Sequence, residues 1–233
     1  MANKTLTQWM VRPRKPFYKQ PWYWGVVGVG GFLLFKPKGA KAALVKSGPV
    51  SKEEAAAAIH KEYPRAFPAL SMAIVDTALS VGAHPYDLAN LIHFESARTF
   101  SAQKENISCK RRNGPDSGYC AVGLIQFLPS TAAGLFGMKR ETVNPKGADK
   151  PKVYSFAQKK AAYDRMSGYT ELQQMRYVKE FLKRQTRRSP NRKLDTPYKV
   201  AMAVFWPSAI NKDPDWKFPA SVPRDNEGIY TPR

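Results

Sequence analysis

Apolar residues recur at helical spacing through most of the middle of the chain, between polar stretches that contain Gly and Pro. This pattern predicts helices over residues 52–63, 67–81, 85–95, from about 129 onward, and over 153–165, 171–188 and 196–206. Residues 36–50, residues 138–152 and the part from Pro207 onward lack the pattern, so we expect a linker, a loop and an irregular tail. No segment strongly indicates a strand. The predicted fold class is mainly α.

Two of the predicted helices begin with a capping box, in which a Ser or Thr before the helix is followed three residues later by Glu or Gln. Ser51 with Glu54 opens the first helix, and Thr170 with Gln173 opens the helix from residue 171. Helical spacing puts five apolar residues of the later helix on one face: Leu172, Met175, Val178, Phe181 and Leu182. We expect this face to pack on the core.

Residues 21–35, PWYWGVVGVGGFLLF, form an uncharged apolar run with basic residues on both sides. A helix across a bilayer needs about 20 apolar residues, and this run is shorter and contains glycines. It fits the apolar part of a secretory signal or a short membrane anchor, with a buried core element as the alternative. The predicted organisation is a basic N-terminal region with this segment, a helical domain and an irregular tail, at 1–50, 51–212 and 213–233.

A glutamate stands where the helical pattern asks for a core residue. Leu88, Leu91 and Ile92 form an apolar face, and the next position on that face is Glu95. Burying an ionised carboxylate is costly, so burial raises its pKa. A carboxyl group that keeps its proton near neutral pH suits general-acid chemistry. The alternative is a Glu at a helix end, half exposed or paired with Arg98.

A second unusual segment, AVGLIQFLPSTA, lies about 30 residues further along the chain. Gly123 permits a close backbone approach, and Gln126 places an amide inside an apolar run before the helix start at Pro129. Such an amide can donate and accept hydrogen bonds toward a sugar or a peptide. A buried Gln satisfied by the backbone is the alternative reading.

Together, Glu95-Ser96 and GLIQFLPSTA at 123–132 resemble the soluble-type lytic transglycosylases of the goose-type lysozyme superfamily. MSGYTELQQMRYVKEFLKR and YKVAMAVFWPSAI resemble helices of phage-associated members, so the resemblance covers about residues 70–212. It implies a lysozyme-like helical domain that cleaves the β-1,4 bond between N-acetylmuramic acid and N-acetylglucosamine. Glu95 would be the general acid and base. The glycan would be oriented or held by Ser96, by Gln126 and by the backbone near Gly123, Leu124 and Ile125.

The chain departs from that family in two places. Where many members carry an Ala-Tyr-Asn-type motif, this chain has VFWPSAI, so Phe205 and Trp206 are the candidates for the glycan groove. The insertion ISCKRRNGPDSGYC adds two candidate second carboxylates, Glu105 just before it and Asp116 within it, which would permit hydrolysis by water. A disulfide between Cys109 and Cys120 would close this loop in an oxidising compartment. An inactive, basic virion or envelope-binding protein is the alternative function.

The chain carries 38 Lys and Arg against 18 Asp and Glu, a formal charge of +20, gathered in blocks. Such an excess predicts attraction to polyanions. The expected partners are peptidoglycan glycan strands, an anionic envelope or membrane surface, and virion proteins. Aromatic residues are not interleaved with the basic blocks, so nucleic acid is not favoured. Neither a cofactor nor a metal is expected, and the expected location is membrane-associated, periplasmic or in a virion.

Overall fold

The computed structural model describes residues 51–105, 120–142 and 152–212. Lys52–Ile210 forms one compact unit of the chain. Its helices, in chain order, are α3 (Lys52–Glu62), α4 (Pro68–Ser80), α5 (Pro85–Glu95), α6 (Pro129–Leu135), α7 (Phe156–Ser167), α8 (Glu171–Thr186), α9 (Pro197–Phe205) and the 3₁₀ helix η3 (Pro207–Ala209). The described residues are therefore mainly helical, which confirms the predicted class.

Most helix starts use a proline or a side-chain cap. α4, α5, α6 and α9 each begin with a proline, whose fixed φ suits the first helical position and whose missing N–H would have no helical partner there. The capping box predicted at Thr170 and Gln173 is present and opens α8. A second box, Ser155 with Gln158, opens α7 and delays its start relative to the predicted 153–165.

Removing either capping hydroxyl should weaken the fold by a similar amount. We expect Ser155→Ala and Thr170→Ala each to lower the free energy of unfolding by about 1 kcal/mol, because an N–H of the first turn loses its acceptor. Denaturant unfolding followed by circular dichroism measures the change. Ser130→Ala, at an exposed position in the first turn of α6, is the control and should stay within about 0.5 kcal/mol of wild type. Equal effects at all three positions would contradict the capping argument.

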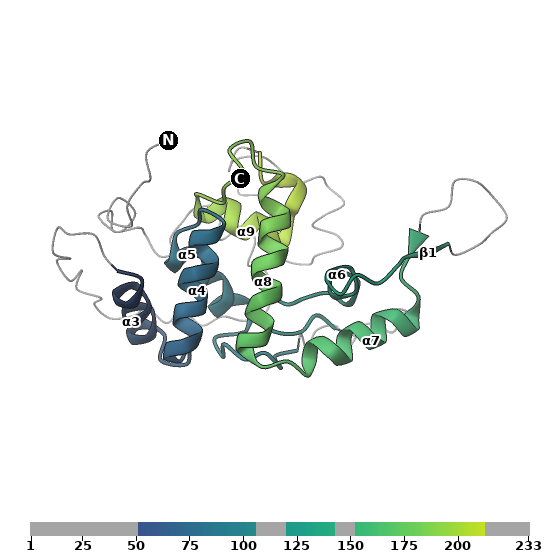
Figure 1. Ribbon diagram of the computed structural model, residues 1–233, viewed down its shortest axis with the longest axis horizontal. Helices are drawn as coiled ribbons and strands as arrows, with labels where there is room; N and C mark the ends of the chain where they lie inside the picture. The colour runs from purple at the N-terminus through teal and green to yellow at the C-terminus, as the bar shows by residue number, and fades with distance from the viewer. Residues whose placement is uncertain (1–50, 106–119, 143–151, 213–233) are drawn as a thin grey trace, which may run out of the picture. The chain divides into compact units, whose positions relative to one another are not determined.

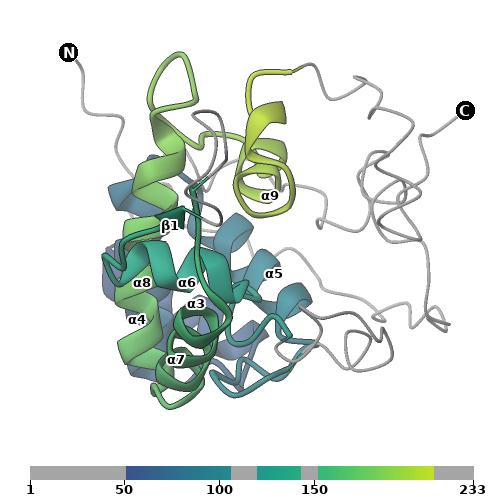
Figure 2. The same cartoon turned by 90° about the vertical axis from the view of Figure 1, so that its right-hand side faces the viewer.

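The helices pack in a consistent order. α3 packs on α4, α4 packs on both α5 and α8, α9 packs on α5 and α8, and α6 packs on α7. Figure 1 shows α4 and α8 side by side, with α7 running away from the foot of α8, and Figure 2 shows α9 beside α5. The largest fully buried side chains form the core: Ile59, Leu70, Ile74, Leu88, Leu91, Ile92, Leu124, Ile125, Met166, Leu182, Leu194 and Met202.

The end of α4 is fixed by a glycine. Gly82 has a φ of 67°, and the N–H of Ala83 donates to the Ala78 carbonyl at 2.9 Å, which closes the helix in the left-handed manner that favours glycine. A Cβ at Gly82 would meet the Lys193 side chain at 2.8 Å. The N–H of Leu194 donates to the Val81 carbonyl at 2.9 Å, so the turn after α8 is held against the end of α4.

Three details differ from the sequence-based expectation. Leu172 was expected on the packed face but is 40% exposed, because it lies on the first turn of α8, ahead of the first buried residue of the helix, Gln174. Two short strands, β1 (Glu141–Thr142) and β2 (Lys152–Val153), pair antiparallel within the region expected to be a loop. Pro207, where the irregular tail was expected to begin, instead opens η3.

Several predicted segments lie outside the described residues. These are the apolar run 21–35 with the rest of 1–50, and the tail 213–233. Among the helices that the structure does describe, none has the length and apolar character that crossing a membrane requires.

Candidate active site

Glu95 is the last residue of α5, and its position is set at both ends of that helix. His84 caps the start through Nδ1, which accepts from the Tyr86 N–H at 3.3 Å. At the other end, the ring of Phe94 meets the ring of Phe205 edge-on, with centroids 6.0 Å apart. The structure thus brings the end of α9 beside the residue next to Glu95. Trp206, the other aromatic candidate, is half-buried directly after α9.

The carboxyl group of Glu95 is held in an environment that favours its neutral form. The side chain keeps some exposed surface, but Oε1 is buried and has no hydrogen-bond partner in the described part of the chain. Burial raises the pKa of Glu95 to about 8. A buried oxygen without a partner costs free energy, on the order of 1–3 kcal/mol. The raised pKa keeps Glu95 protonated at neutral pH, and its Oε1 is left without a hydrogen bond from any described residue.

His93, two residues earlier, has a pKa that is lowered, whereas the pKa of Glu95 is raised. Its ring lies 4.9 Å from the Tyr63 ring and 5.5 Å from the Phe100 ring, centroid to centroid. Burial, together with the charges of Arg98 and Arg65, lowers its pKa to about 4. His93 is therefore uncharged at neutral pH, and Glu95, not His93, carries an acidic proton in this part of the structure.

Ser96 holds the turn that follows Glu95. It is fully buried, its hydroxyl donates to the Ile92 carbonyl at 2.7 Å, and the same oxygen accepts from the Phe100 N–H at 2.9 Å. Ala97, Arg98 and Phe100 all have positive φ, a conformation that costs free energy in residues other than glycine. The hydroxyl of Ser96 thus fixes a strained turn beside Glu95. Its predicted influence on the glycan stays a prediction.

The GLIQ segment forms a tight turn closed by Val122 and Phe127, which bridge each other. Gly123 has a φ of 92°, and its N–H donates to the Lys104 carbonyl at 2.8 Å. The Gln126 amide donates to the carbonyls of Lys104 and Gly123 at 2.9 and 3.1 Å. The amide nitrogen therefore serves the backbone, as the alternative reading of the sequence expected, and leaves the Gln126 oxygen for other partners.

Gln174 on α8 connects the GLIQ turn to the segment that follows Glu95-Ser96, and the sequence interpretation missed it. Its Oε1 accepts from the Leu124 N–H at 3.0 Å. Its amide nitrogen donates to the carbonyls of Ala102 and Met166 at 2.7 and 2.8 Å. A Cβ at Gly123 would lie 2.2 Å from Gln174 Oε1, so the turn has no room for a side chain there.

These bonds tie the segment after Glu95 and the GLIQ turn to the same residue of α8. The Leu124 N–H is occupied by Gln174 and the Gly123 N–H by the Lys104 carbonyl, while the side chains of Leu124 and Ile125 are buried. The predicted contacts of Gly123, Leu124 and Ile125 with the glycan remain predictions. A signal for Gln174 existed in the sequence, because it lies four residues before Val178 and eight before Leu182 on the apolar face of the helix.

Of the two candidate second carboxylates, the structure describes one. Glu105 accepts a hydrogen bond from the hydroxyl of Tyr163 on α7, and its backbone bridges to Val122 at the GLIQ turn. Burial and the Glu105 carboxylate raise the pKa of Tyr163 to about 12, so the phenol remains a donor. Asp116 lies outside the described residues. Cys120 is buried and takes part in a disulfide, and its predicted partner Cys109 also lies outside them.

No group of three or more His, Cys, Asp or Glu side chains in the described ranges is placed to hold a metal ion. Comparison with known proteins adds no assignment, since no family model, curated protein or solved structure matches the chain significantly. The arrangement itself offers a single protonated carboxylic acid beside a strained turn. The chemistry open to it is proton donation to a leaving group, followed by proton removal.

The raised pKa of Glu95 makes the stability of the protein depend on pH in a defined direction. Between the ordinary pKa of 4.5 and about 8, the folded protein holds a proton that the unfolded chain has released. The contribution of this proton to the free energy of unfolding is therefore fully present below pH 4.5, and it is lost as the pH rises through 8. We expect Glu95→Gln, which cannot ionise, to become more stable than wild type by about 2–4 kcal/mol by pH 9.

Denaturant unfolding of both proteins at intervals from pH 4.5 to 9 measures this difference. Glu180→Gln is the control, because Glu180 is an exposed carboxylate paired with Arg184. Its difference from wild type should stay flat over the same range. A flat difference for Glu95→Gln as well would show that the Glu95 carboxyl group is ionised at neutral pH in the folded protein.

Proposed function

We propose that this protein is a peptidoglycan lytic transglycosylase that cleaves the β-1,4 bond between N-acetylmuramic acid and N-acetylglucosamine. The observation that carries the proposal is the carboxyl group of Glu95, whose buried Oε1 has no hydrogen-bond partner among the described residues and whose pKa is raised to about 8. The GLIQ motif and the segment that follows Glu95-Ser96 support it, because Leu124 and Ala102 are both tied to Gln174 of α8.

The proposed reaction uses Glu95 twice. Its proton passes to the glycosidic oxygen while the bond to C1 of the muramic acid breaks. The resulting carboxylate then takes the proton of the C6 hydroxyl of the same sugar, whose oxygen bonds to C1. The product is a 1,6-anhydro ring, no water is consumed, and Glu95 ends as it began. The N-acetyl group of the substrate can assist at C1, so a second carboxylate is not needed.

Hydrolysis by water is the alternative outcome at the same site, and it requires a base. Glu105 lies next to the GLIQ turn through its bridge to Val122, but its carboxylate already accepts from Tyr163. An engaged carboxylate is a weaker base, which favours the transglycosylase route. Asp116 remains a candidate outside the described residues.

We propose that the protein acts at the cell envelope. There it would serve as a phage enzyme for host penetration or lysis. The formal charge of +20 supports attraction to anionic wall or membrane surfaces. Peptidoglycan glycan strands are the proposed substrate, with virion proteins as proposed partners. A membrane-associated, periplasmic or virion location would follow from the apolar run at residues 21–35.

Analysis of the products released from purified sacculi tests the proposed function. The expected result is soluble muropeptides that end in 1,6-anhydromuramic acid. Reducing muramic ends would identify a muramidase that uses water. Sacculi left intact by correctly folded protein would contradict both enzymatic readings and favour a catalytically inactive, envelope-binding protein.

A further inference from the structure

The outer face of α8 carries a line of basic side chains. Arg176, Lys179, Lys183 and Arg187 follow one another at separations of three and four residues, which places them on one side of the helix and of its last turn. We call these four residues the α8 stripe. The buried residues Gln174, Val178 and Leu182 lie on the opposite side, toward the core. The stripe therefore points away from the packed interior.

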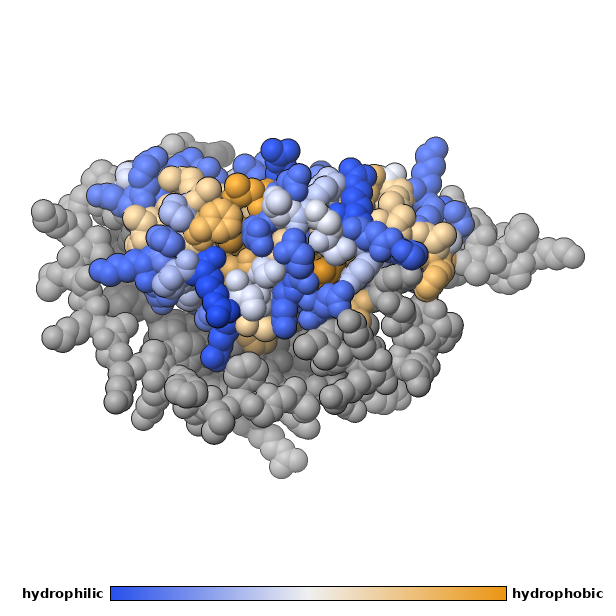
Figure 3. All heavy atoms as spheres, turned by 90° about the horizontal axis from the view of Figure 1, so that it is seen from below, coloured by the Kyte–Doolittle hydropathy of each residue, from blue (hydrophilic) through white to orange (hydrophobic). Residues whose placement is uncertain are grey.

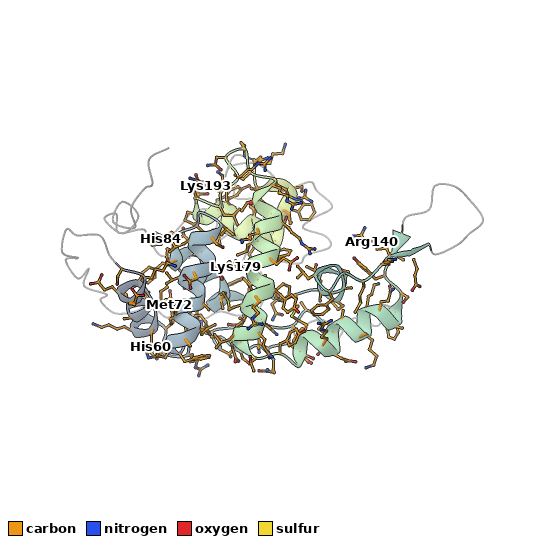
Figure 4. All side chains as sticks on the ribbon, viewed as in Figure 1. His60, Met72, His84, Arg140, Lys179 and Lys193 are labelled. Carbon is orange, nitrogen blue, oxygen red and sulfur yellow. The ribbon has the colours of Figure 1, made fainter. Side chains whose placement is uncertain are left out.

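The charges of the α8 stripe are not neutralised within the described part of the protein. None of the four side chains forms an ion pair or a side-chain hydrogen bond there, and Arg176, Lys183 and Arg187 are exposed. The acidic neighbour on the helix, Glu180, is paired with Arg184, which also donates to the Gly134 carbonyl at 3.2 Å. Figure 4 labels Lys179 on α8 and Lys193 near the top of the molecule, beyond the end of that helix. The stripe thus presents net positive charge to solvent.

The shape of the stripe suits a linear ligand. At 1.5 Å per residue, its first and last members lie about 16 Å apart along the helix, with neighbours about 5–6 Å apart. Its width is a single side chain. A polymer with one phosphate per repeat matches a row of this kind better than a compact anion does, because each repeat meets another cation.

The chemistry of the stripe narrows the choice of polymer. No aromatic side chain belongs to it, so it offers nothing on which bases could stack. Insertion into a membrane would need apolar residues along the same face, and on α8 a single large apolar side chain, Leu172, is exposed. Seen from below, exposed apolar side chains are interspersed with hydrophilic ones (Figure 3).

We propose that the α8 stripe binds a linear phosphodiester polymer of the cell envelope. This inference rests on the proposed function, since it makes the stripe the contact that holds the enzyme on the wall that it cleaves. α8 carries the stripe on one side and Gln174, which anchors the GLIQ turn, on the other. Binding at the stripe therefore leaves the side of α8 that serves the candidate active site untouched.

Binding to purified sacculi tests this proposal. The protein is the full chain in its Glu95→Gln form, so that the sacculi stay intact, and the probes are sacculi with their phosphodiester polymer and the same sacculi after chemical removal of the polymer. One variant replaces all four members of the α8 stripe with Gln. A control of equal charge replaces four exposed cations on other elements with Gln: Lys61, Lys139, Arg140 and Lys160.

We expect the stripe variant to bind polymer-bearing sacculi at least 10-fold more weakly at low salt, and the control less than about 3-fold. Affinity falls with salt, and each lost phosphate contact makes the plot of log affinity against log salt less steep by about 0.7–1. The magnitude of its slope should therefore decrease by about 3 in the stripe variant alone. Removing the polymer should abolish the difference between the two variants. Circular dichroism confirms that both variants remain helical.

Equal losses in the two variants would overturn the proposal, because total charge alone would then explain binding. Equally tight binding of the protein with an intact stripe to polymer-bearing and to stripped sacculi would overturn it as well. Tighter binding to duplex DNA than to the wall polymer at equal phosphate concentration would identify nucleic acid as the ligand instead. The stripe variant with Glu95 restored should still cleave short glycan strands that carry no phosphodiester polymer at the wild-type rate, which separates failure of this proposal from failure of the proposed activity.

Discussion

Replacing Glu95 with Gln is expected to lower the rate of glycan cleavage by a factor of about 10²–10⁴. Gln has the shape of Glu and fits the same buried position, but it has no proton to give to the glycosidic oxygen. Release of anhydromuramic ends from sacculi, followed by chromatography against time, measures the rate. The loss should appear in kcat, because the proton is transferred in the chemical step.

The matched control is Glu62→Gln. Glu62 is also the last residue of a helix, and burial raises its pKa as well, but it closes α3 and not α5. We expect it to retain wild-type cleavage. In wild type, kcat/KM should fall as the pH rises above about 8, where the Glu95 acid loses its proton. Unchanged cleavage by Glu95→Gln would remove Glu95 from the mechanism, and an activity loss centred near pH 4.5 would contradict its raised pKa.

Replacing Gln174 with Leu is expected to lower the free energy of unfolding by about 3–5 kcal/mol. Leu keeps most of the volume but removes three buried hydrogen bonds. The Leu124 N–H and the Ala102 carbonyl would then lose their partner in the interior, while the Met166 carbonyl would keep the N–H of Tyr169 at 3.3 Å. Because Gln174 joins the GLIQ turn to the segment after Glu95, cleavage should also fall under conditions where the variant is still folded.

Gln185→Leu provides a control on the same helix. The Gln185 side-chain oxygen is buried, but it accepts no hydrogen bond within the described part of the chain. Removing this oxygen breaks no hydrogen bond to another described residue, so the variant should unfold within about 1 kcal/mol of wild type or be more stable. Denaturant unfolding of the two variants in parallel makes the comparison. Similar losses would mean that the effect at Gln174 comes from changed packing on α8 and not from its hydrogen bonds.

Helix positions were readable from the sequence because their signals are local. Prolines at the first helical position, the Thr170 capping box and the apolar spacing of α4, α5 and α8 each act within a few residues. The start of α7 was placed too early, since β2 takes up the preceding residues and the Ser155 cap defines the true start. β2 forms only by pairing with β1, which local spacing does not reveal.

The features of the candidate site also divide into those visible in the sequence and those visible only in the tertiary structure. The sequence alone marked Glu95, because a carboxylate interrupts an apolar helical face, and it marked the GLIQ segment through Gly123 and Gln126. Only the tertiary structure decided that the GLIQ turn is joined through Gln174 to Ala102, after Glu95, that Gln126 serves the backbone, and that Tyr163 engages Glu105. The reason is physical. Spacing along the chain fixes which face of a helix is apolar, whereas burial and hydrogen bonds between distant segments depend on how the helices pack.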